Sequence, residues 1–243
     1  MTLADLKGDL HAHTDATDGR DTIDAMAAGA QAAGLSYLAL TDHSRSLAMT
    51  GGLDEHGLLA HARRIREAGR RLDGFTLLAG VECDILPDGR LDLAEDCLAE
   101  LDLVIASVHS AFNQDERQMT DRILRAMDSP VVDIVGHPTG RLLLRREAYP
   151  VNIEQIIEAA ARLGVMLEIS SQVDRLDLND IHARLARDRG VKLVINTDSH
   201  SSRGFGTLRW GVTVARRAWL EATDVANTRP VTEFRALLRR HAR

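Results

Sequence analysis

Short runs of aliphatic and β-branched residues alternate with amphipathic helical segments seven times along this chain of 243 residues. This alternation constrains the fold most, because repeated strand–helix units form a parallel sheet with right-handed crossovers. The predicted strands are residues 7–13, 37–43, 76–84, 103–109, 132–137, 165–170 and 192–198. The predicted helices are residues 23–33, 54–72, 94–101, 116–127, 153–163 and 179–189, then 208–220 and 232–240.

Composition narrows the class of protein. No Pro/Ser-rich linker divides residues 1–243, so we expect a single domain, within the size of one-domain barrels of about 250 residues. The net charge of −6 excludes a general positive field for DNA or anionic membranes. The sequence has no leader-like start and no run near the ~20 apolar residues of a membrane span. Two cysteines are too few for a disulfide framework, and we expect a cytoplasmic protein without membrane partners.

Six of the seven predicted strands end in residues that bind metals. Their ends read HAH, TDH, GVECD, SVH, GHP and NTDSH. In α/β folds the carboxyl ends of the strands carry the active site. A doubly wound sheet offers only one or two switch points, whereas a closed barrel brings every strand end to one mouth. The sequence therefore favours an α/β barrel.

Nine side chains are candidate metal ligands at this mouth. They are His11, His13, Asp18, His43, Glu82, His109, His137, Asp198 and His200. Alternation along a strand points His11 and His13 the same way, and likewise Asp198 and His200.

Other polar residues receive plainer interpretations. The remaining histidines are expected to be solvated surface residues; they are His56, His61, His182 and His241. The carboxylates Asp9, Asp42 and Asp84 either orient ligand imidazoles or cap loops. Cys83 is expected in the core because it alternates with Glu82.

Nine ligands exceed the needs of one ion, since zinc takes about four. We therefore expect two or three divalent ions, and nitrogen and oxygen donors without thiolate suit Zn, Mn or Fe. Ions about 3.5 to 4 Å apart favour phosphate ester hydrolysis, because they hold phosphoryl oxygens and lower the pKa of a bound water. The sequence therefore predicts a phosphoesterase.

The motifs resemble those of the PHP (polymerase and histidinol phosphatase) phosphoesterases, from about Leu3 to the end of the chain. They are Asp9-Leu10-His11-Ala12-His13, Thr41-Asp42-His43, Gly80-Val81-Glu82, Ser107-Val108-His109, Gly136-His137-Pro138 and Asp198-Ser199-His200. The resemblance implies a distorted (β/α)7 TIM-like barrel with three metal ions. More narrowly, residues 8–11, 107–113, 136–142 and 191–198 are similar to the C-terminal PHP domain of bacterial family X DNA polymerases.

The resemblance also implies a division of the ligands. His11, His13, Glu82 and Asp198 would hold one ion. Glu82 would bridge to a second ion, on His109 and His137, and Asp18, His43 and His200 would hold a third. It implies a manganese-dependent 3'-5' exonuclease or another 3'-end-processing activity on DNA. On this basis Glu82, Asp198 and His200 are the expected catalytic residues. Two features depart from this resemblance: we expect no polymerase domains before Leu3, and Glu168-Ile169-Ser170-Ser171-Gln172 replaces a stretch that usually carries Asn.

Substrate contacts and rival functions complete the predictions. Arg141 and Arg203 lie in loops after strands and are candidates to bind a non-reacting phosphate.

A small-molecule phosphatase, such as one acting on histidinol phosphate, is an alternative function, because 3% aromatic residues offer few stacking platforms for single-stranded DNA. An amidohydrolase-type enzyme is less favoured, since Lys7 and Lys192 lie at the wrong ends of their strands. A third alternative is a non-catalytic binding module that evolved from an enzyme. Such a module would be expected to have lost metal ligands, and none of the nine is lost here. The native metal, the oligomeric state and whether the chain stands alone remain open.

Overall fold

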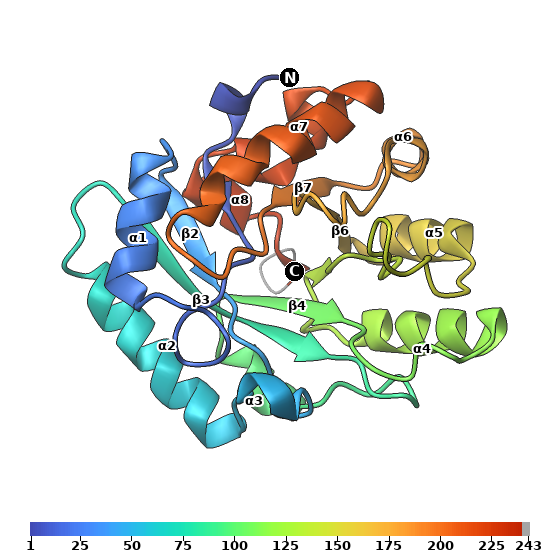
Figure 1. Cartoon of the computed structure of the whole chain (residues 1–243), viewed down its shortest axis with the longest axis horizontal. Helices are drawn as coiled ribbons and strands as arrows, with labels where there is room; N and C mark the ends of the chain where they lie inside the picture. Colours follow the sequence, from blue (N-terminus) through green and yellow to red (C-terminus); the bar gives the residue numbers. More distant parts are fainter. Residues whose placement is uncertain (240–243) are drawn as a thin grey trace.

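The computed structural model describes residues 1–239, which form seven parallel strands alternating with helices. The strands are β1 (Gly8–Asp9), β2 (Tyr37–Leu40), β3 (Thr76–Asp84), β4 (Leu103–Ser107), β5 (Ile134–Val135), β6 (Met166–Ser170) and β7 (Leu193–Asn196), and they pair in chain order. The helices are α1 (Ile23–Ala32), α2 (Glu55–Gly69), α3 (Glu95–Ala99), α4 (Glu116–Asp128), α5 (Ile153–Leu163), α6 (Asp180–Asp188), α7 (Leu208–Arg217) and α8 (Val231–Arg235). Helices α1 to α7 form an outer ring around the strands (Figure 1). The predicted single-domain (β/α)7 barrel is confirmed.

Side-chain caps fix where several of the helices begin. The carboxylates of Asp54 and Asp115 accept from the third backbone N–H of α2 and α4, and the amide oxygen of Asn179 does so for α6. Each cap satisfies a backbone donor that a helix start leaves free. The longest helix, α2, has only 15 residues, and no helix among residues 1–239 has the length and apolarity to cross a bilayer.

The first and last strands meet at a seam. An isolated bridge pairs Ala12 with Ser199 just beyond their ends. Below it, Asn227 lies between the strands: its amide nitrogen donates to the carbonyls of Gly8 (2.8 Å) and Ile195 (2.7 Å), and its amide oxygen accepts from Ile195 N (3.1 Å). One buried side chain thus completes hydrogen bonding that a strand pair would otherwise supply.

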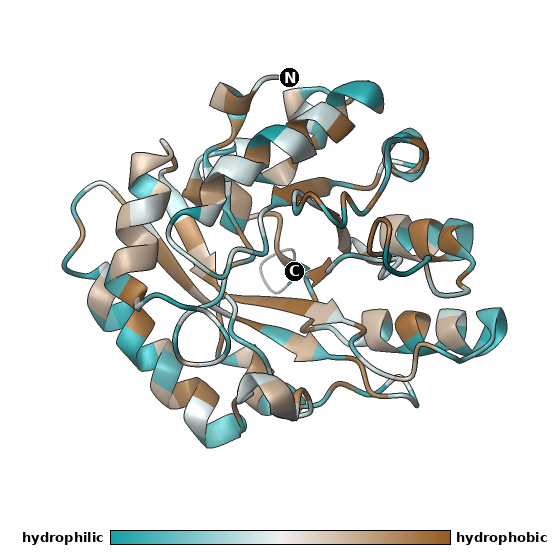
Figure 2. Ribbon diagram, in the orientation of Figure 1, coloured by the Kyte–Doolittle hydropathy of each residue, from teal (hydrophilic) through white to brown (hydrophobic). Residues whose placement is uncertain are grey.

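Two apolar layers stabilise the barrel. The larger lies between the strands and the outer helices, and includes Cys83 as predicted. The smaller fills the barrel interior, where α8 closes the amino-terminal end: Phe234 is fully buried and stacks on Tyr37 with ring centroids 5.8 Å apart. Figure 2 shows the strands as predominantly hydrophobic and the helices as mixed. Polar groups are thereby left to the opposite end of the barrel.

Several strands are shorter than predicted because side chains take over the pairing. The chain remains extended beyond β1, but Leu10 N donates to Asn196 Oδ1 (3.0 Å) and Ala12 N to Thr41 Oγ1 (3.2 Å). Residues 7–13 therefore contribute only Gly8–Asp9 to the ladder. Near the other end of the chain, a helix was predicted at residues 232–240, but α8 starts one residue earlier and is shorter, Val231–Arg235; residue 240 lies outside the described residues.

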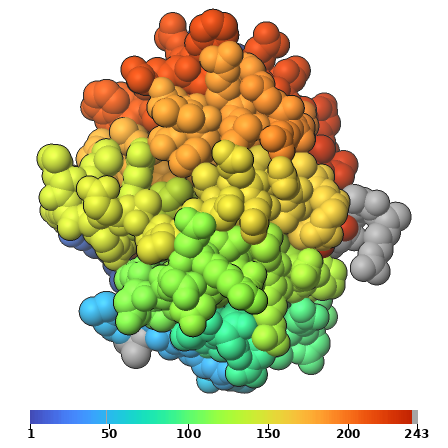
Figure 3. All heavy atoms as spheres, turned by 90° about the vertical axis from the view of Figure 1, so that its right-hand side faces the viewer, coloured from blue at the N-terminus to red at the C-terminus, as the bar shows by residue number. Residues whose placement is uncertain are grey.

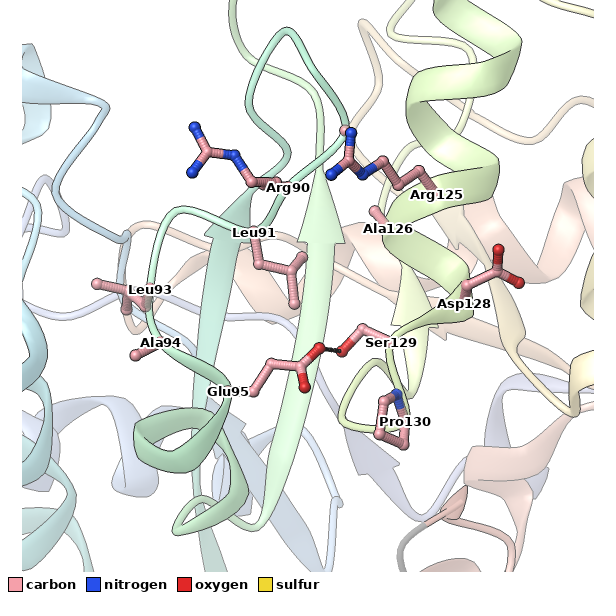
Figure 4. Close-up of a pocket in the computed structure, with 11 residues that line it drawn as sticks. Arg90, Leu91, Leu93, Ala94, Glu95, Arg125, Ala126, Asp128, Ser129 and Pro130 are labelled. Carbon is pink, nitrogen blue, oxygen red and sulfur yellow. Dashed lines mark hydrogen bonds between the residues drawn. The ribbon is translucent and has the colours of Figure 1, made fainter.

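A groove of about 510 Å³ lies on the outer wall, between the 86–94 segment, α3 and α4. It exists because α3 has only 5 residues and covers little of the wall. In Figure 4 the side chains of Arg90 and Arg125 lie toward one end, and Glu95 hydrogen bonds to Ser129 toward the other. None of the nine predicted ligands is among its lining residues.

Candidate metal centre

The nine predicted ligands lie together at the carboxyl end of the barrel, with Glu82 at their centre. Glu82 is the seventh residue of β3 and is only 1% exposed. Its Oε2 lies 3.3 Å from His11 Nε2 and 3.1 Å from His43 Nδ1. Its Oε1 lies 2.9 Å from His137 Nε2 and 3.3 Å from His109 Nε2. The two carboxylate oxygens therefore face two different sets of imidazoles, which is the arrangement of a bridging ligand.

A second part of the site lies toward solvent. Asp18, on the loop after β1, places Oδ2 3.4 Å from His43 Nε2 and 3.2 Å from His200 Nε2. Asp198 places Oδ1 3.0 Å from His13 Nε2. Asp18 and His200 are 29% and 33% exposed, so this edge of the centre is open.

Three groups of donors have the spacing of a metal site, with ligand atoms within 4.8 Å of one another. The groups are His11, His13 and Asp198; His43, Glu82 and His109; and His13, Asp18, His43 and His200. His13 and His43 each belong to two groups, so the three groups form one continuous cluster of ligands.

Several nitrogen and oxygen atoms of these side chains are buried without hydrogen-bond partners, so the residues fit metal ions. Such atoms are His11 Nε2, His13 Nδ1, His43 Nδ1 and Glu82 Oε2. An unpaired buried polar atom costs free energy, about 1 to 3 kcal/mol in mutational data. Divalent cations would satisfy these nitrogen and oxygen donors, and the absence of thiolates among them suits Zn, Mn or Fe.

The site's electrostatics also favour cations. Burial alone would raise the pKa of Glu82, but His109, His11 and His43 hold it well below its ordinary value. Burial would lower the pKa of His43, but Glu82 and Asp18 raise it to about 10. The carboxylates are therefore ionised, and without metal they recruit protons onto imidazoles. Ions bound there would displace those protons.

Buried carboxylates orient two of the imidazoles. Glu168 Oε1 accepts from His11 Nδ1 (2.8 Å), and Glu168 Oε2 accepts from the backbone N of His137 (2.7 Å). Asp84 Oδ1 accepts from His109 Nδ1 (2.8 Å). These bonds place the proton on Nδ1 and leave Nε2 of His11 and His109 facing Glu82, as in many carboxylate–histidine–metal sites. Asp84 therefore orients a candidate ligand.

His61 corrects one prediction. It was expected to be a surface residue, but it is 1% exposed on α2, and its Nε2 lies 2.8 Å from Asp42 Oδ2. Asp42 also accepts from Thr14 N (2.8 Å) and Thr17 Oγ1 (2.7 Å), on the loop that carries Asp18. His56 is exposed as predicted, His182 is half-buried, and His241 lies outside the described residues.

The predicted phosphate-binding arginines lie in different surroundings. Arg141 Nε donates to the carbonyl of Arg175 (2.8 Å), and its Nη2 donates to that of Leu176, so its guanidinium anchors the loop after β6. Arg203 is exposed. Neither has a described hydrogen bond to any of the nine ligands.

Sequence reasoning missed Arg175. Its side chain is 16% exposed, its Nε lies 3.7 Å from Asp198 Oδ2, and that Nε has no hydrogen-bond partner. Together with burial, its charge lowers the pKa of His137. Its place in a loop after a strand is the same signal that selected Arg141 and Arg203.

Two candidate ligands adopt backbone conformations that sequence patterns do not reveal. His137 has φ 25° and Asp198 has φ 50°, both in the left-handed region that non-glycine residues rarely enter. Such strain persists where the surrounding structure over-determines it, and it is common at functional sites.

The two lysines lie outside this centre. Lys7 and Lys192 donate hydrogen bonds to the carbonyls of Ala4 and Thr223.

Comparison with known proteins agrees with the geometry. Residues 9–172 match the family described as the PHP domain. The chain therefore belongs to the PHP family, as its motifs predicted.

Individual relatives fall into two kinds. The chain is 43% identical over 241 residues to the Bacillus subtilis protein "DNA polymerase/3'-5' exonuclease PolX", covering 99% of this chain but 42% of that protein. It is also 30% identical over 231 residues to a "Probable phosphatase" of Thermoanaerobacter, covering 90% of this chain and 89% of that protein.

A solved structure shares the fold. The histidinol phosphate phosphatase of Lactococcus lactis, complexed with Zn, L-histidinol and phosphate, superposes with a TM-score of 0.63 at 16% identity. The match covers 88% of this chain and 94% of that one, and it supports the barrel architecture.

Proposed function

We propose that this protein is a phosphoesterase that uses three divalent metal ions to cleave phosphodiester bonds at the 3' ends of DNA. The observation that carries the proposal is that five imidazoles, those of His11, His13, His43, His109 and His137, lie within 3.6 Å of the two oxygens of Glu82, with Asp18, Asp198 and His200 beside them. His11, His13, Glu82 and Asp198 would hold one ion; Glu82, His109 and His137 a second; Asp18, His43 and His200 a third. When bound, such ions supply charge for the phosphoryl oxygens and an activated water.

The chain's own residues hold this centre in its working protonation state. Glu168 and Asp84 keep protons on the Nδ1 atoms of His11 and His109. Burial lowers the pKa of His13 and His137, so both are neutral near pH 7 and present lone pairs. Glu82, Asp198 and His200 are the residues that we place nearest the reacting phosphate.

Arg175 is our candidate for binding a phosphate oxygen. It lies beside Asp198, and its unpaired Nε is available for a charge-assisted hydrogen bond. We place it ahead of Arg141, whose guanidinium is engaged by two carbonyls, and of Arg203, which lies in solvent.

DNA is the preferred substrate for two reasons. The PolX relative, named as a 3'-5' exonuclease, matches this chain almost from end to end. The centre is also open along the edge formed by Asp18 and His200, which leaves room for a polymer to enter.

A small phosphate monoester is the second candidate substrate. Supporting it are the full-length similarity to a probable phosphatase and the low aromatic content of 3%. Such a phosphatase would use the same metal centre, so only the substrate distinguishes the two proposals.

The test is to incubate protein loaded with Mn or Zn with 3'-labelled and 5'-labelled single-stranded oligonucleotides, and separately with histidinol phosphate. The proposal expects shortening from the 3' end that is lost in His109→Ala and retained in His56→Ala, a matched change of an exposed histidine. Phosphate release from histidinol phosphate with intact DNA would instead establish the phosphatase. Inertness toward both substrates would refute both proposals.

A further inference from the structure

The loop after β5 exposes an apolar tip. Leu144 is fully exposed, at 108% of the reference area, and Leu143 is 36% exposed. Leu144 also has φ 63°, a left-handed conformation that glycine adopts freely and leucine does not. The chain thus bears two costs at one residue, hydration of a large apolar side chain and backbone strain. Both indicate that something covers this side chain during function.

The loop is built as a firm support for this tip. Leu142 and Arg146 form an antiparallel bridge, with Leu142 N donating to Arg146 O (2.8 Å). The Arg146 guanidinium lies 4.1 Å above the ring of Phe112, and its Nη2 donates to Gly140 O (2.7 Å). Because these contacts fix the base of the loop, Leu144 is held in solvent and does not fold back onto the protein surface.

The tip lies on the rim of the metal centre. The same loop carries His137, seven residues before Leu144, and Leu143 N donates to Asp174 O (2.5 Å) on the loop that carries Arg175. On that second loop Val173 is 58% exposed and adds to the apolar surface. Figure 3 shows the yellow-green part of the chain, which includes this loop, projecting at the left edge of the molecule.

The two loops carry four arginines against Glu147, Asp174 and the buried Asp177, and this excess of positive charge favours nucleic acid over an apolar protein partner. Arg145, next to Leu144, is exposed and has no described ion pair, and Arg141, Arg146 and Arg175 lie at the base of the two loops. Leucine side chains inserted between bases unstack them, while arginines contact the flanking phosphates.

We infer that Leu143 and Leu144 form a wedge that packs against the terminal nucleobases of a DNA strand and separates the last base from its neighbour. This inference rests on the proposed function and deepens it, because it names how the same site takes a polymer end. The separation would carry the terminal phosphodiester past the rim to the centre around Glu82.

The experiment compares wild type with Leu144→Gly, which suits the left-handed backbone and so preserves the fold, and with Leu143→Ser. The control is Leu3→Ser, an exposed leucine (48%) in the N-terminal turn. For each protein, we measure kcat/KM on a single-stranded oligonucleotide and on bis(p-nitrophenyl) phosphate, which has no base. We expect the ratio of the two values to fall about tenfold in both loop variants, the size of one lost apolar contact, and to stay constant in the control.

A binding measurement tests the wedge directly. An oligonucleotide with 2-aminopurine at its 3' end gains fluorescence when that base unstacks. We expect a gain with His109→Ala, which binds without cleaving, and a smaller gain with His109→Ala/Leu144→Gly. Unchanged ratios and fluorescence with oligonucleotide cleavage intact would overturn the wedge alone, and a Leu144-dependent dimer would assign the tip to a second copy. Failure of the wild type to cleave or bind any oligonucleotide would overturn the nuclease proposal and the wedge together.

Discussion

At the amino-terminal end of the barrel Phe234 stacks on Tyr37 in an apolar interior, whereas at the carboxyl end Glu82 lies among buried histidines. The first end is filled with apolar side chains, whereas the second is open along Asp18 and His200 and leaves buried nitrogen and oxygen atoms of His11, His13, His43 and Glu82 without hydrogen-bond partners. Burying apolar area stabilises the fold, and burying unpaired polar atoms does the reverse. The difference shows that the barrel separates stability from chemistry along its axis, and the predictions below test that separation.

The largest expected effect is at the carboxyl end. Glu82→Gln removes the charge that both sets of imidazoles face, and we expect phosphoesterase activity to fall about a thousandfold or more, with loss of bound metal. Activity assays and metal analysis of the purified protein would measure this, with His56→Gln as the control. Full metal content and activity in Glu82→Gln would remove Glu82 from the centre.

At the opposite end, Phe234→Ala should do the converse. Removing a fully buried ring costs about 3 to 5 kcal/mol of unfolding free energy. Urea denaturation would measure this loss, while kcat per folded molecule should match the wild type because the ring lies away from Glu82. A large fall in kcat at a temperature where the variant remains folded would contradict the separation of the two ends.

A third prediction concerns pH and lies in the loop after β6. Burial raises the pKa of Asp177 to about 6, so the folded protein prefers the protonated acid. Between about pH 4 and 6 the folded state binds more protons than the unfolded state, and stability should fall as pH rises, by at most about 3 kcal/mol. Asp177→Asn should remove this slope and be the more stable protein at pH 8. Equal slopes for both proteins in urea unfolding from pH 4 to 8 would show that Asp177 does not cause it.

The smallest effect is expected at Glu168, which contacts the candidate ligand His11 and is not itself one of the nine ligands. Glu168→Gln weakens the acceptor that orients His11, and we expect metal affinity to fall about 10- to 100-fold. Isothermal titration would measure the affinity, and excess metal should restore activity. If excess metal fails to restore activity although the site is filled, Glu168 has a role beyond orientation.

The sequence predicts the candidate metal ligands better than the residues that surround and support them. Ligand-type residues at strand ends predicted the nine donors, because the carboxyl ends of parallel strands must converge. The burial of His61 depended on the tertiary contact between α2 and Asp42, which no local pattern records. Arg175 and Asn227 act through loop positions that only the folded chain defines. The short ladders of β1 and β5 follow from long-range side-chain bonds such as Val104 N to Asp133 Oδ2, which propensity does not anticipate.

The seam closed by Asn227 joins the chain's beginning to its end. His13 lies on the first side of this seam and Asp198 on the second, and His13 Nε2 is 3.0 Å from Asp198 Oδ1. Residues synthesised early and residues synthesised late must therefore meet before these two ligands can share an ion. Asn227 follows Asp198 by nearly thirty residues and touches neither ligand in its described bonds. A chain truncated before residue 227 would therefore carry every ligand but lack the three hydrogen bonds by which Asn227 links Gly8 to Ile195. Its seam would depend on the bonds nearer the ligands, such as His13 N to Ser199 O (2.9 Å) and Thr197 Oγ1 to Asp9 Oδ2 (2.6 Å).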